Sequence, residues 1–286
     1  MKVGITLASG QLGGAILKET INLAGIENTV AIARSPEKIN QPGVETRRAD
    51  LDDRETCKIA FQGLDVVLLV SSNSHPNVRL LQHTNAIDGA QAAGVGRMVF
   101  ISIVGANNIN PNAIQKVAAD TEAYLKNSGL EWTIGRNGLY IEPDLEYIQN
   151  YIQEGKVSNC AADGKCSYTS RNELAFAYAK LVTGNHHAGK IYNLAGEAIT
   201  QQELVNYLND FYKINLVYEW VDAATYRQDR IAYLGDELGP IIADIYESIS
   251  KGEFQMESNF LEVTGRPHKT IMEILPDFPI DSPKEN

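Results

Sequence analysis

The sequence predicts an α/β fold, a doubly wound parallel sheet with a smaller α/β C-terminal lobe. Strand-like and helix-like stretches alternate five times up to residue 103, which is typical of right-handed crossovers in a parallel sheet. The run Leu64–Val70 is almost continuously apolar, as expected of a strand covered by helices on both faces. With 286 residues, the chain can form one large domain or a domain with a smaller lobe.

The N-terminus predicts a nucleotide-binding turn. Lys2–Leu7 has the pattern of a short buried strand, Ala8, Ser9 and Gly10 that of a tight turn, and Gln11–Leu23 that of a helix. Strand, small-residue turn and helix in this order open a dinucleotide-binding Rossmann unit. The small residues would let a pyrophosphate approach the backbone, and the helix would offer it unpaired N–H groups and the positive end of its dipole.

Leu7 departs from one common form of this turn, Gly-x-x-Gly-x-x-Gly. Gly10 and Gly13 occupy the second and third glycine positions, but Leu7 occupies the first. A side chain at that position could crowd the turn or the cofactor. The alternative is that both glycines only allow close packing between helix and strand.

The second predicted strand, Thr29–Ala33, ends at an arginine. An acidic residue here would bond a ribose 2′-hydroxyl, whereas an arginine suits a 2′-phosphate. Arg34 therefore predicts NADP rather than NAD, and Lys38 adds positive charge nearby. A solvated surface arginine is the alternative.

Two further strand ends carry polar residues. The third predicted strand is Val44–Arg47, and Asp52 behind it either faces the adenine or caps the helix that begins near Arg54. The fourth strand ends in small polar residues, and such residues at the carboxyl end of a central strand would line a crevice. Ser71 and Ser72 are therefore candidate cofactor contacts.

The remaining elements divide the chain. The next predicted ones are a helix 77–93, a strand 97–103, a loop 104–112, a helix 113–127 and a strand 132–135. Beyond Tyr140 we expect a helix 144–153, a turn-rich stretch 158–168, a helix 174–182, a strand 190–194, a helix to residue 211 and a strand 215–221. Capping-box spacing at Ser170/Glu173 and Thr200/Glu203 marks two helix starts. We expect residues 1–140 to be the NAD(P)-binding domain, with 170–195 packing back onto it, and 141–286 to be a substrate lobe.

Composition excludes several classes. The formal net charge of −11 argues against a nucleic-acid partner. Three widely spaced cysteines predict neither a disulfide framework nor a metal site, and indicate a reduced, cytoplasmic protein. We see no signal peptide and no apolar run of membrane-spanning length, so no membrane partner is expected.

Five blocks carry a resemblance to a known family. They are Ser9–Gly14, Ala31–Arg34, Arg136–Tyr140, Thr169–Ala175 and Gly265–Pro267. With them the chain resembles the NmrA-like branch of the atypical short-chain dehydrogenases, and looks most like the type 2 NAD(P)H:quinone oxidoreductases and the triphenylmethane dye reductases. The resemblance spans essentially the whole chain.

The resemblance implies NADPH lying across the carboxyl ends of the strands, with the pyrophosphate at Ser9–Leu12 and the nicotinamide near Asn137–Tyr140. The predicted cofactor contacts are Leu7, Ala8, Ser9, Gly10, Gln11, Leu12, Arg34, Lys38, Ser71, Ser72, Arg136, Asn137, Gly138, Leu139 and Tyr140.

A catalytic pair of the wider family is missing. Many short-chain dehydrogenases use Tyr-x-x-x-Lys to donate a proton, but Ile114 and Ala118 stand at these positions. Lys116 would face another side of the helix, and a helical Glu122 is more often a solvated or packing residue. The absence argues against an alcohol or ketone dehydrogenase and favours a quinone, a conjugated enone or a cationic dye-like acceptor. No catalytic residue is assigned, and Asn137 and Tyr140 are the candidates.

An aromatic acceptor needs an aromatic lining. Tyr140, Tyr147 and Tyr151, together with Val104 after the fifth strand, are the predicted substrate contacts. Tyr147 and Tyr151 are four residues apart and would share a helix face. Ordinary core packing is the alternative.

Three functions follow from these observations. The first is an NADPH-dependent reductase of a small planar or conjugated acceptor. The second is a dinucleotide-sensing regulator without turnover, which the missing Tyr/Lys pair fits equally well. The third takes Leu7 as evidence of a lost cofactor and predicts a cofactor-free isomerase or lyase. The oligomeric state stays open, with a homodimer as one alternative.

Overall fold

The computed structural model describes residues 1–109 and 111–280, which form two compact units. The first unit consists of Met1–Asn137, Arg171–Leu194 and Ser258–Pro267. The second unit consists of Gly138–Ser170, Ala195–Glu257 and the residues from His268 onward. Among the described residues, none of the helices combines the length and the apolar character needed to cross a membrane.

The first unit is built on a seven-stranded parallel sheet of order β10-β6-β5-β4-β1-β2-β3. Its strands are β1 (Val3–Ile5), β2 (Thr29–Ala33), β3 (Glu45–Arg48), β4 (Val66–Leu69), β5 (Arg97–Ile103), β6 (Glu131–Asn137) and β10 (Lys190–Leu194). The strand order reverses between β1 and β4, so the doubly wound sheet predicted from the sequence is confirmed. In such sheets the reversal point, at the carboxyl ends of the strands, is where ligands bind.

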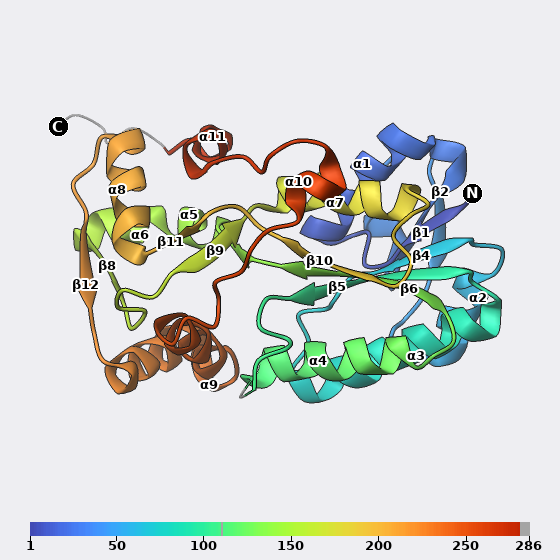
Figure 1. Ribbon diagram of the computed structural model, residues 1–286, viewed down its shortest axis with the longest axis horizontal. Coiled ribbons are helices and arrows are strands. Elements are labelled where there is room, and N and C mark those ends of the chain that lie inside the picture. Colours follow the sequence, from blue (N-terminus) through green and yellow to red (C-terminus); the bar gives the residue numbers. More distant parts are fainter. Residues whose placement is uncertain (110, 281–286) are drawn as a thin grey trace. The chain divides into compact units, whose positions relative to one another are not determined.

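Helices cover both faces of this sheet (Figure 1). They are α1 (Gln11–Ala24), α2 (Arg54–Phe61), α3 (Pro76–Ala93), α4 (Ala113–Lys126), α7 (Arg171–Thr183) and α10 (Phe260–Thr264), with short 3₁₀ turns η1 (Ile26–Asn28) and η2 (Pro36–Lys38). On one face α1 packs against α7, and on the other α2, α3 and α4 pack side by side.

The apolar strand pattern is explained by this double cover. All residues of β2 and β4 are buried, and side chains such as Phe61 and Phe100 fill the layer beneath α2 and α3. Burying one such large apolar side chain stabilises the fold by about 1.5–3 kcal/mol. The carboxyl ends of the strands are thereby held in fixed register.

The second unit has two small sheets. Their orders are β11-β9-β7 and β12-β8. The elements are β7 (Leu139–Tyr140), α5 (Glu142–Glu146), α6 (Ile148–Glu154), β8 (Lys156–Asn159), β9 (Cys166–Thr169), β11 (Ala198–Ile199), α8 (Gln201–Tyr212), β12 (Val217–Trp220), α9 (Ala223–Ser250), α11 (Ile271–Ile274) and η3 (Leu275–Asp277).

One prediction in this unit was wrong, and another was incomplete. The single helix expected over 144–153 is two helices, because Tyr147 has φ −92° and ψ 0° and interrupts the helical path between α5 and α6. The stretch 158–168, expected to be rich in turns, has a turn at residues 162–163 and also contains residues of β8 and β9. These short strands pair with partners distant in sequence, so local periodicity gives little sign of them.

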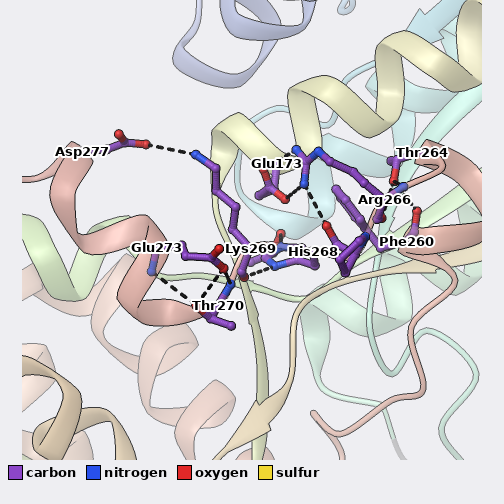
Figure 2. A network of polar contacts seen from close by, with 11 residues as sticks. Glu173, Phe260, Thr264, Arg266, His268, Lys269, Thr270, Glu273 and Asp277 are labelled. Atoms are coloured by element: carbon purple, nitrogen blue, oxygen red, sulfur yellow. Dashed lines mark hydrogen bonds and ion pairs between the residues drawn. The ribbon is translucent and has the colours of Figure 1, made fainter.

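Capping boxes start two helices of this unit. The box predicted at Thr200 and Glu203 is confirmed at the start of α8. Thr270 and Glu273 form another at α11, visible in Figure 2. In each box the two side chains satisfy backbone N–H groups that a helix start otherwise leaves unpaired.

A sharp bend divides α9. Gly235 has φ 82° and ψ 172°, so the helix breaks there. Farther along, a Cβ added to Gly239 would lie 2.6 Å from the backbone N and Cα of Ile231. The two halves of α9 therefore approach each other at Gly239, where only glycine leaves enough space.

Candidate functional site

The turn after β1 has the backbone path that its motif requires. Leu7 has φ +50°, a left-handed conformation that favours glycine and costs an L residue about 1–2 kcal/mol. The Gly10 N–H donates to the Leu7 carbonyl at 2.9 Å, and the Ala8 N–H donates to the Ile32 carbonyl at 3.0 Å. Leu7 therefore follows the glycine path at the first motif position, while its partly buried side chain packs on the core.

Close packing requires glycine at position 13 and leaves little space for a side chain at position 10. A Cβ on Gly13 would lie 2.3 Å from the Leu7 carbonyl oxygen, and one on Gly10 would lie 3.3 Å from the same atom. The start of α1 can therefore approach the turn only because Gly13 has no side chain. This packing role is the alternative considered for the glycines, and it is compatible with a role in binding.

The start of α1 can receive an anion. Gly10 is the N-cap and gives no side-chain hydrogen bond to the first turn, which also contains no acidic residue. Ser9, Gly10 and Gln11 are exposed there. Unsatisfied N–H groups and the positive end of the helix dipole at such a terminus favour phosphate.

Three cations lie at the ends of β2 and β3. Arg34 follows β2, Lys38 ends η2, and Arg48 ends β3 in register with Ala33. All three are exposed, and none of their side chains has a hydrogen bond or ion pair with another residue in the described part of the chain. An unpaired cluster of this kind can hold a phosphate dianion.

Arg48 was missed by the sequence analysis, which ended the third strand at Arg47. The Arg47 guanidinium donates to the carbonyls of Ala60 and Gln62, at 2.8 and 2.7 Å. Successive side chains point to opposite faces of a strand, so Arg48 projects to the other face. Two successive arginines at the end of a strand were the sequence feature that could have indicated a second cation beside Arg34.

A glutamine links two polar strand ends. The Gln82 Nε2 donates to Asp52 Oδ1 at 2.8 Å, and the Ser72 hydroxyl donates to Gln82 Oε1 at 2.6 Å. Asp52 does not cap α2. Asp53 does, by accepting hydrogen bonds from the backbone N–H groups of the first turn. Gln82 is buried on α3 and was also missed, since no local pattern distinguishes it.

Arg136 is held by a buried carboxylate. Its Nε and Nη2 donate to Glu122 at 2.9 and 2.7 Å, and its Nη1 donates to Asn107 at 2.9 Å. The Ser102 hydroxyl donates to Glu122 at 2.7 Å. Burial opposes ionisation of Glu122, but the hydrogen bonds from Arg136 and Ser102 hold its pKa below the ordinary value. Glu122 is therefore a buried partner of Arg136 and not a solvated residue.

Asn137 is positioned by a tyrosine. The Tyr178 hydroxyl lies 2.6 Å from Asn137 Oδ1 and 2.9 Å from the Gly135 carbonyl oxygen. The Val104 N–H donates to the Asn137 carbonyl at 2.8 Å. A Cβ on Gly135 would lie 2.3 Å from the Tyr178 hydroxyl, so this arrangement requires glycine. Val104 and Asn137 are thus neighbours at the ends of β5 and β6, and both are buried.

The next three predicted contacts begin the second unit. A Cβ on Gly138 would lie 2.2 Å from the Ser167 carbonyl oxygen, so the strand path requires glycine there. Leu139 and Tyr140 form β7, in parallel register with Tyr168 and Thr169, and both are half-buried.

The two remaining tyrosines are in contact with each other. The rings of Tyr147 and Tyr151 are 5.0 Å apart in an edge-to-face arrangement. The Tyr151 hydroxyl donates to the buried Asp144 at 2.9 Å, and Tyr168 and Tyr246 also point hydroxyls at this carboxylate, at 3.5 and 3.3 Å. Burial raises the pKa of Asp144, although these hydrogen bonds oppose the shift. Tyr151 thus has a core role, whereas Tyr147 is half-exposed.

Apolar residues occupy the two positions at which the sequence analysis looked for a Tyr-x-x-x-Lys pair, Ile114 and Ala118. Ala118 is buried on α4, where a catalytic lysine would stand. Lys116 is exposed and pairs with Asp120 at 3.0 Å, so it does not replace that lysine.

A family model described as NAD(P)H-binding matches residues 8–182. Quinone oxidoreductase 2 of Escherichia coli is 31% identical over 277 residues, which cover 95% of this chain and 96% of that protein. An NmrA-like family domain-containing oxidoreductase of Aspergillus flavus is 30% identical over 96% of this chain and 95% of its own length.

Solved structures of NADPH-binding reductases are also similar to this chain over nearly its whole length. The NADPH-dependent quinone oxidoreductase of E. coli in complex with NADPH has a TM-score of 0.91 at 30% identity, covering 96% of this chain and 99% of that chain. The triphenylmethane reductase of Citrobacter sp. in complex with NADP(H) has a TM-score of 0.90 at 26% identity, and the match covers 98% of this chain and 100% of that chain.

Proposed function

This chain belongs to the NAD(P)H-binding, NmrA-like family of oxidoreductases, and we propose that it reduces quinones with NADPH as the hydride donor. The first unit would bind the cofactor and the second unit the acceptor. What the reduced nicotinamide supplies, when bound, is the hydride. The residues of the chain would bind the cofactor and the acceptor, orient them and exclude water from between them.

The residues of the first unit fit a phosphorylated dinucleotide. The start of α1, with Gly10 as its N-cap and Gly13 in its first turn, suits the pyrophosphate. The unpaired cations Arg34, Lys38 and Arg48 suit the 2′-phosphate, and they are the observation that carries the preference for NADPH. Ser71 and Ser72 are proposed to lie beside the adenosine, with Asp52 and Ser72 held in place by Gln82.

The strand ends of β6 and β7 are proposed to hold the nicotinamide. Asn137 is oriented by Tyr178, and Gly138 allows the backbone to pass close to Ser167. Arg136 would act through its backbone, since its guanidinium is bound to Glu122 and Asn107. Leu139 and Tyr140 would contact the ring from β7.

The lack of a proton donor at positions 114 and 118 bears on the class of acceptor. Reduction of a ketone needs a proton at the carbonyl oxygen, and neither Ile114 nor Ala118 can provide one. A quinone accepts hydride to give a hydroquinone anion, which water can protonate afterwards. The apolar residues at both positions therefore support a quinone more than an alcohol or ketone.

Calorimetric titration with NADPH, and separately with NADH, tests the cofactor. We expect NADPH to bind at least about tenfold more tightly than NADH, or about 1.4 kcal/mol. Equal affinities would contradict the role of the cations. Turnover with 2-methyl-1,4-naphthoquinone then tests the activity. Tight binding without turnover would favour the dinucleotide-sensing regulator.

The cofactor-free isomerase or lyase took Leu7 as evidence of a lost cofactor. Leu7 adopts the left-handed backbone of the glycine position, and this supports NADPH binding over the cofactor-free alternative.

A further inference from the structure

Arg230, in the second unit, has no hydrogen-bond or ion-pair partner among residues 1–109 and 111–280. It lies in the first half of α9, and its Nε is buried without a hydrogen bond. The guanidinium forms no hydrogen bond or ion pair with any residue that the structure describes. Buried donors are nearly always satisfied, so an unused one indicates a position for a ligand or water.

A neighbouring arginine shows what is unusual about Arg230. Arg227 stands one helical turn earlier and binds the carboxylates of Asp244 and Glu247, which lie on the second half of α9. Its charge therefore has a structural role within the bent helix. Among the described residues, Arg230 has no such carboxylate, so its N–H donors are left available.

Two tyrosine rings lie beside the Arg230 guanidinium. It lies 5.2 Å from the ring centre of Tyr226 and 5.5 Å from that of Tyr233. Tyr233 in turn contacts Tyr147, with ring centres 5.3 Å apart. Cation–π contacts of this kind hold an arginine in place without using its N–H donors. We call these four residues, Tyr147, Tyr226, Arg230 and Tyr233, the Arg230 cluster.

The Arg230 cluster reaches solvent. The side chain of Tyr233 is 55% exposed, and Tyr147 is half-exposed. Residues 226, 230 and 233 follow helical spacing, so they lie along one face of α9. The cluster thus offers aromatic surface and hydrogen-bond donors at the same place, which suits a flat ring that carries oxygen.

We propose that the Arg230 cluster binds the acceptor, with the tyrosine rings packing on its ring system and the Arg230 guanidinium donating to a quinone oxygen. This inference rests on the proposed function and identifies the acceptor class. In the reaction, hydride carries two electrons from the nicotinamide to the quinone, which becomes a hydroquinone anion. Arg230 stabilises the negative oxygen and keeps its own proton, and water supplies the proton that completes the hydroquinone.

A fixed positive charge also sets specificity. An anionic ring such as 2-hydroxy-1,4-naphthoquinone should bind more tightly than neutral 2-methyl-1,4-naphthoquinone. A cationic triphenylmethane dye should bind weakly, because like charges repel. The cluster therefore favours oxygen-bearing quinones over cationic dyes.

The test uses Arg230→Met, which keeps an unbranched apolar side chain and removes charge and donors, and Arg230→Lys, which keeps charge and removes the planar guanidinium. We measure the Kd of 2-hydroxy-1,4-naphthoquinone by calorimetry, the Kd of NADPH, and the thermal transition. We expect Arg230→Met to raise the quinone Kd about tenfold, a change equal to 1.4 kcal/mol, with Arg230→Lys intermediate. The NADPH Kd should change less than about twofold in both variants.

Arg227→Met is the matched control, since it removes an arginine from the same helix. It should lower the thermal transition without changing the quinone Kd. An unchanged quinone Kd in folded Arg230→Met, or no quinone binding by the wild type, would overturn the inference. If Arg230→Met does not fold, Tyr233→Ala at the exposed edge replaces it, with a several-fold rise in Kd expected and an unchanged Kd contradicting the cluster.

This experiment separates two failures. Loss of NADPH binding or of quinone turnover in the wild type would contradict the proposed function. Quinone binding that is insensitive to Arg230 would contradict the Arg230 cluster alone.

Discussion

Arg266 forms a two-point ion pair with Glu173, in which Nη1 lies 2.6 Å from Oε2 and Nη2 lies 2.6 Å from Oε1 (Figure 2). The guanidinium also lies 4.7 Å from the ring centre of Phe176 and 5.4 Å from that of Phe260. Glu173 is on α7, whereas Arg266 belongs to the returning segment Ser258–Pro267. The pair therefore fastens this segment to the helix layer of the first unit.

Glu173→Gln should destabilise the first unit. The Glu173 side chain is 3% exposed and that of Arg266 is 38% exposed, so the pair is only partly screened. We expect Glu173→Gln to lower the free energy of unfolding by about 1–3 kcal/mol, which lies between the costs of breaking a surface ion pair and a buried one. Urea denaturation measures it. Lys116→Ala, which removes an exposed ion pair, should cost less than about 0.5 kcal/mol, and an equal loss in both variants would refute the special role of Arg266.

Gly13→Ala should disrupt the nucleotide turn. The new Cβ would lie 2.3 Å from the Leu7 carbonyl oxygen, and backbone atoms cannot move away easily. We expect a loss of about 1–3 kcal/mol in stability, the usual range for overpacking, and weakened NADPH binding. Unfolding and calorimetric titration check both effects, and a variant with wild-type affinity would show that the turn adapts.

Leu7→Gly is the complementary change. It relieves the left-handed strain at φ +50°, worth about 1–2 kcal/mol, but removes a side chain that packs on the core. The two effects oppose each other, so we expect stability within about 1 kcal/mol of the wild type and little change in NADPH affinity. A large rise in affinity from a negligible value would mean that the leucine side chain blocks the cofactor.

Arg34→Ala and Arg48→Ala should weaken NADPH binding and spare NADH. Neither side chain pairs with a described residue, and the two lie at adjacent strand ends, where a 2′-phosphate would sit between them. Losing one charge-assisted contact corresponds to about 1.5–3 kcal/mol, or roughly tenfold or more in Kd. Arg54→Ala, an exposed arginine at the start of α2, is the control. An unchanged NADPH Kd in Arg48→Ala would remove that residue from the site.

Buried His83 predicts a pH dependence of stability. Burial, with a smaller contribution from Arg79, lowers the pKa of His83 from 6.5 to about 3. The unfolded chain therefore binds a proton below pH 6.5 that the folded chain does not, so stability falls between pH 6.5 and about 3. The slope is about 1.4 kcal/mol per pH unit. Denaturation at pH 7 and pH 5 measures the loss of unfolding free energy on acidification. This loss should be smaller for His83→Gln than for the wild type, and equal losses would contradict the assignment to His83.

Local pattern was enough for much of the fold. Thr29–Ala33, Arg97–Ile103 and Lys190–Leu194 were predicted with the bounds that the structure has, because apolar runs between turn residues specify buried strands. The interrupted helix at Tyr147 was not, since Tyr147 lacks any helix-breaking side chain.

The site was less accessible to prediction. Asp52 and Asp53 are equally good caps by type, and only the backbone path decides that Asp53 is used. The positions of Arg48 beside Ala33 and of Glu122 beside Arg136 depend on strand register and helix packing. The ion pairs of Arg227 with Asp244 and Glu247 join residues on either side of the bend in α9 at Gly235. Such relationships arise between distant residues and leave no local periodicity.

The most direct test of the central claim is an anaerobic single-turnover experiment. Excess protein is mixed with NADPH and 2-methyl-1,4-naphthoquinone, and the near-ultraviolet absorbance of the reduced nicotinamide is followed by stopped flow. We predict its rapid loss with NADPH, at least about tenfold faster than with NADH at equal subsaturating concentration, and no loss without the quinone. Absorbance that persists with both cofactors would contradict the reductase and leave a protein that binds the dinucleotide without using it.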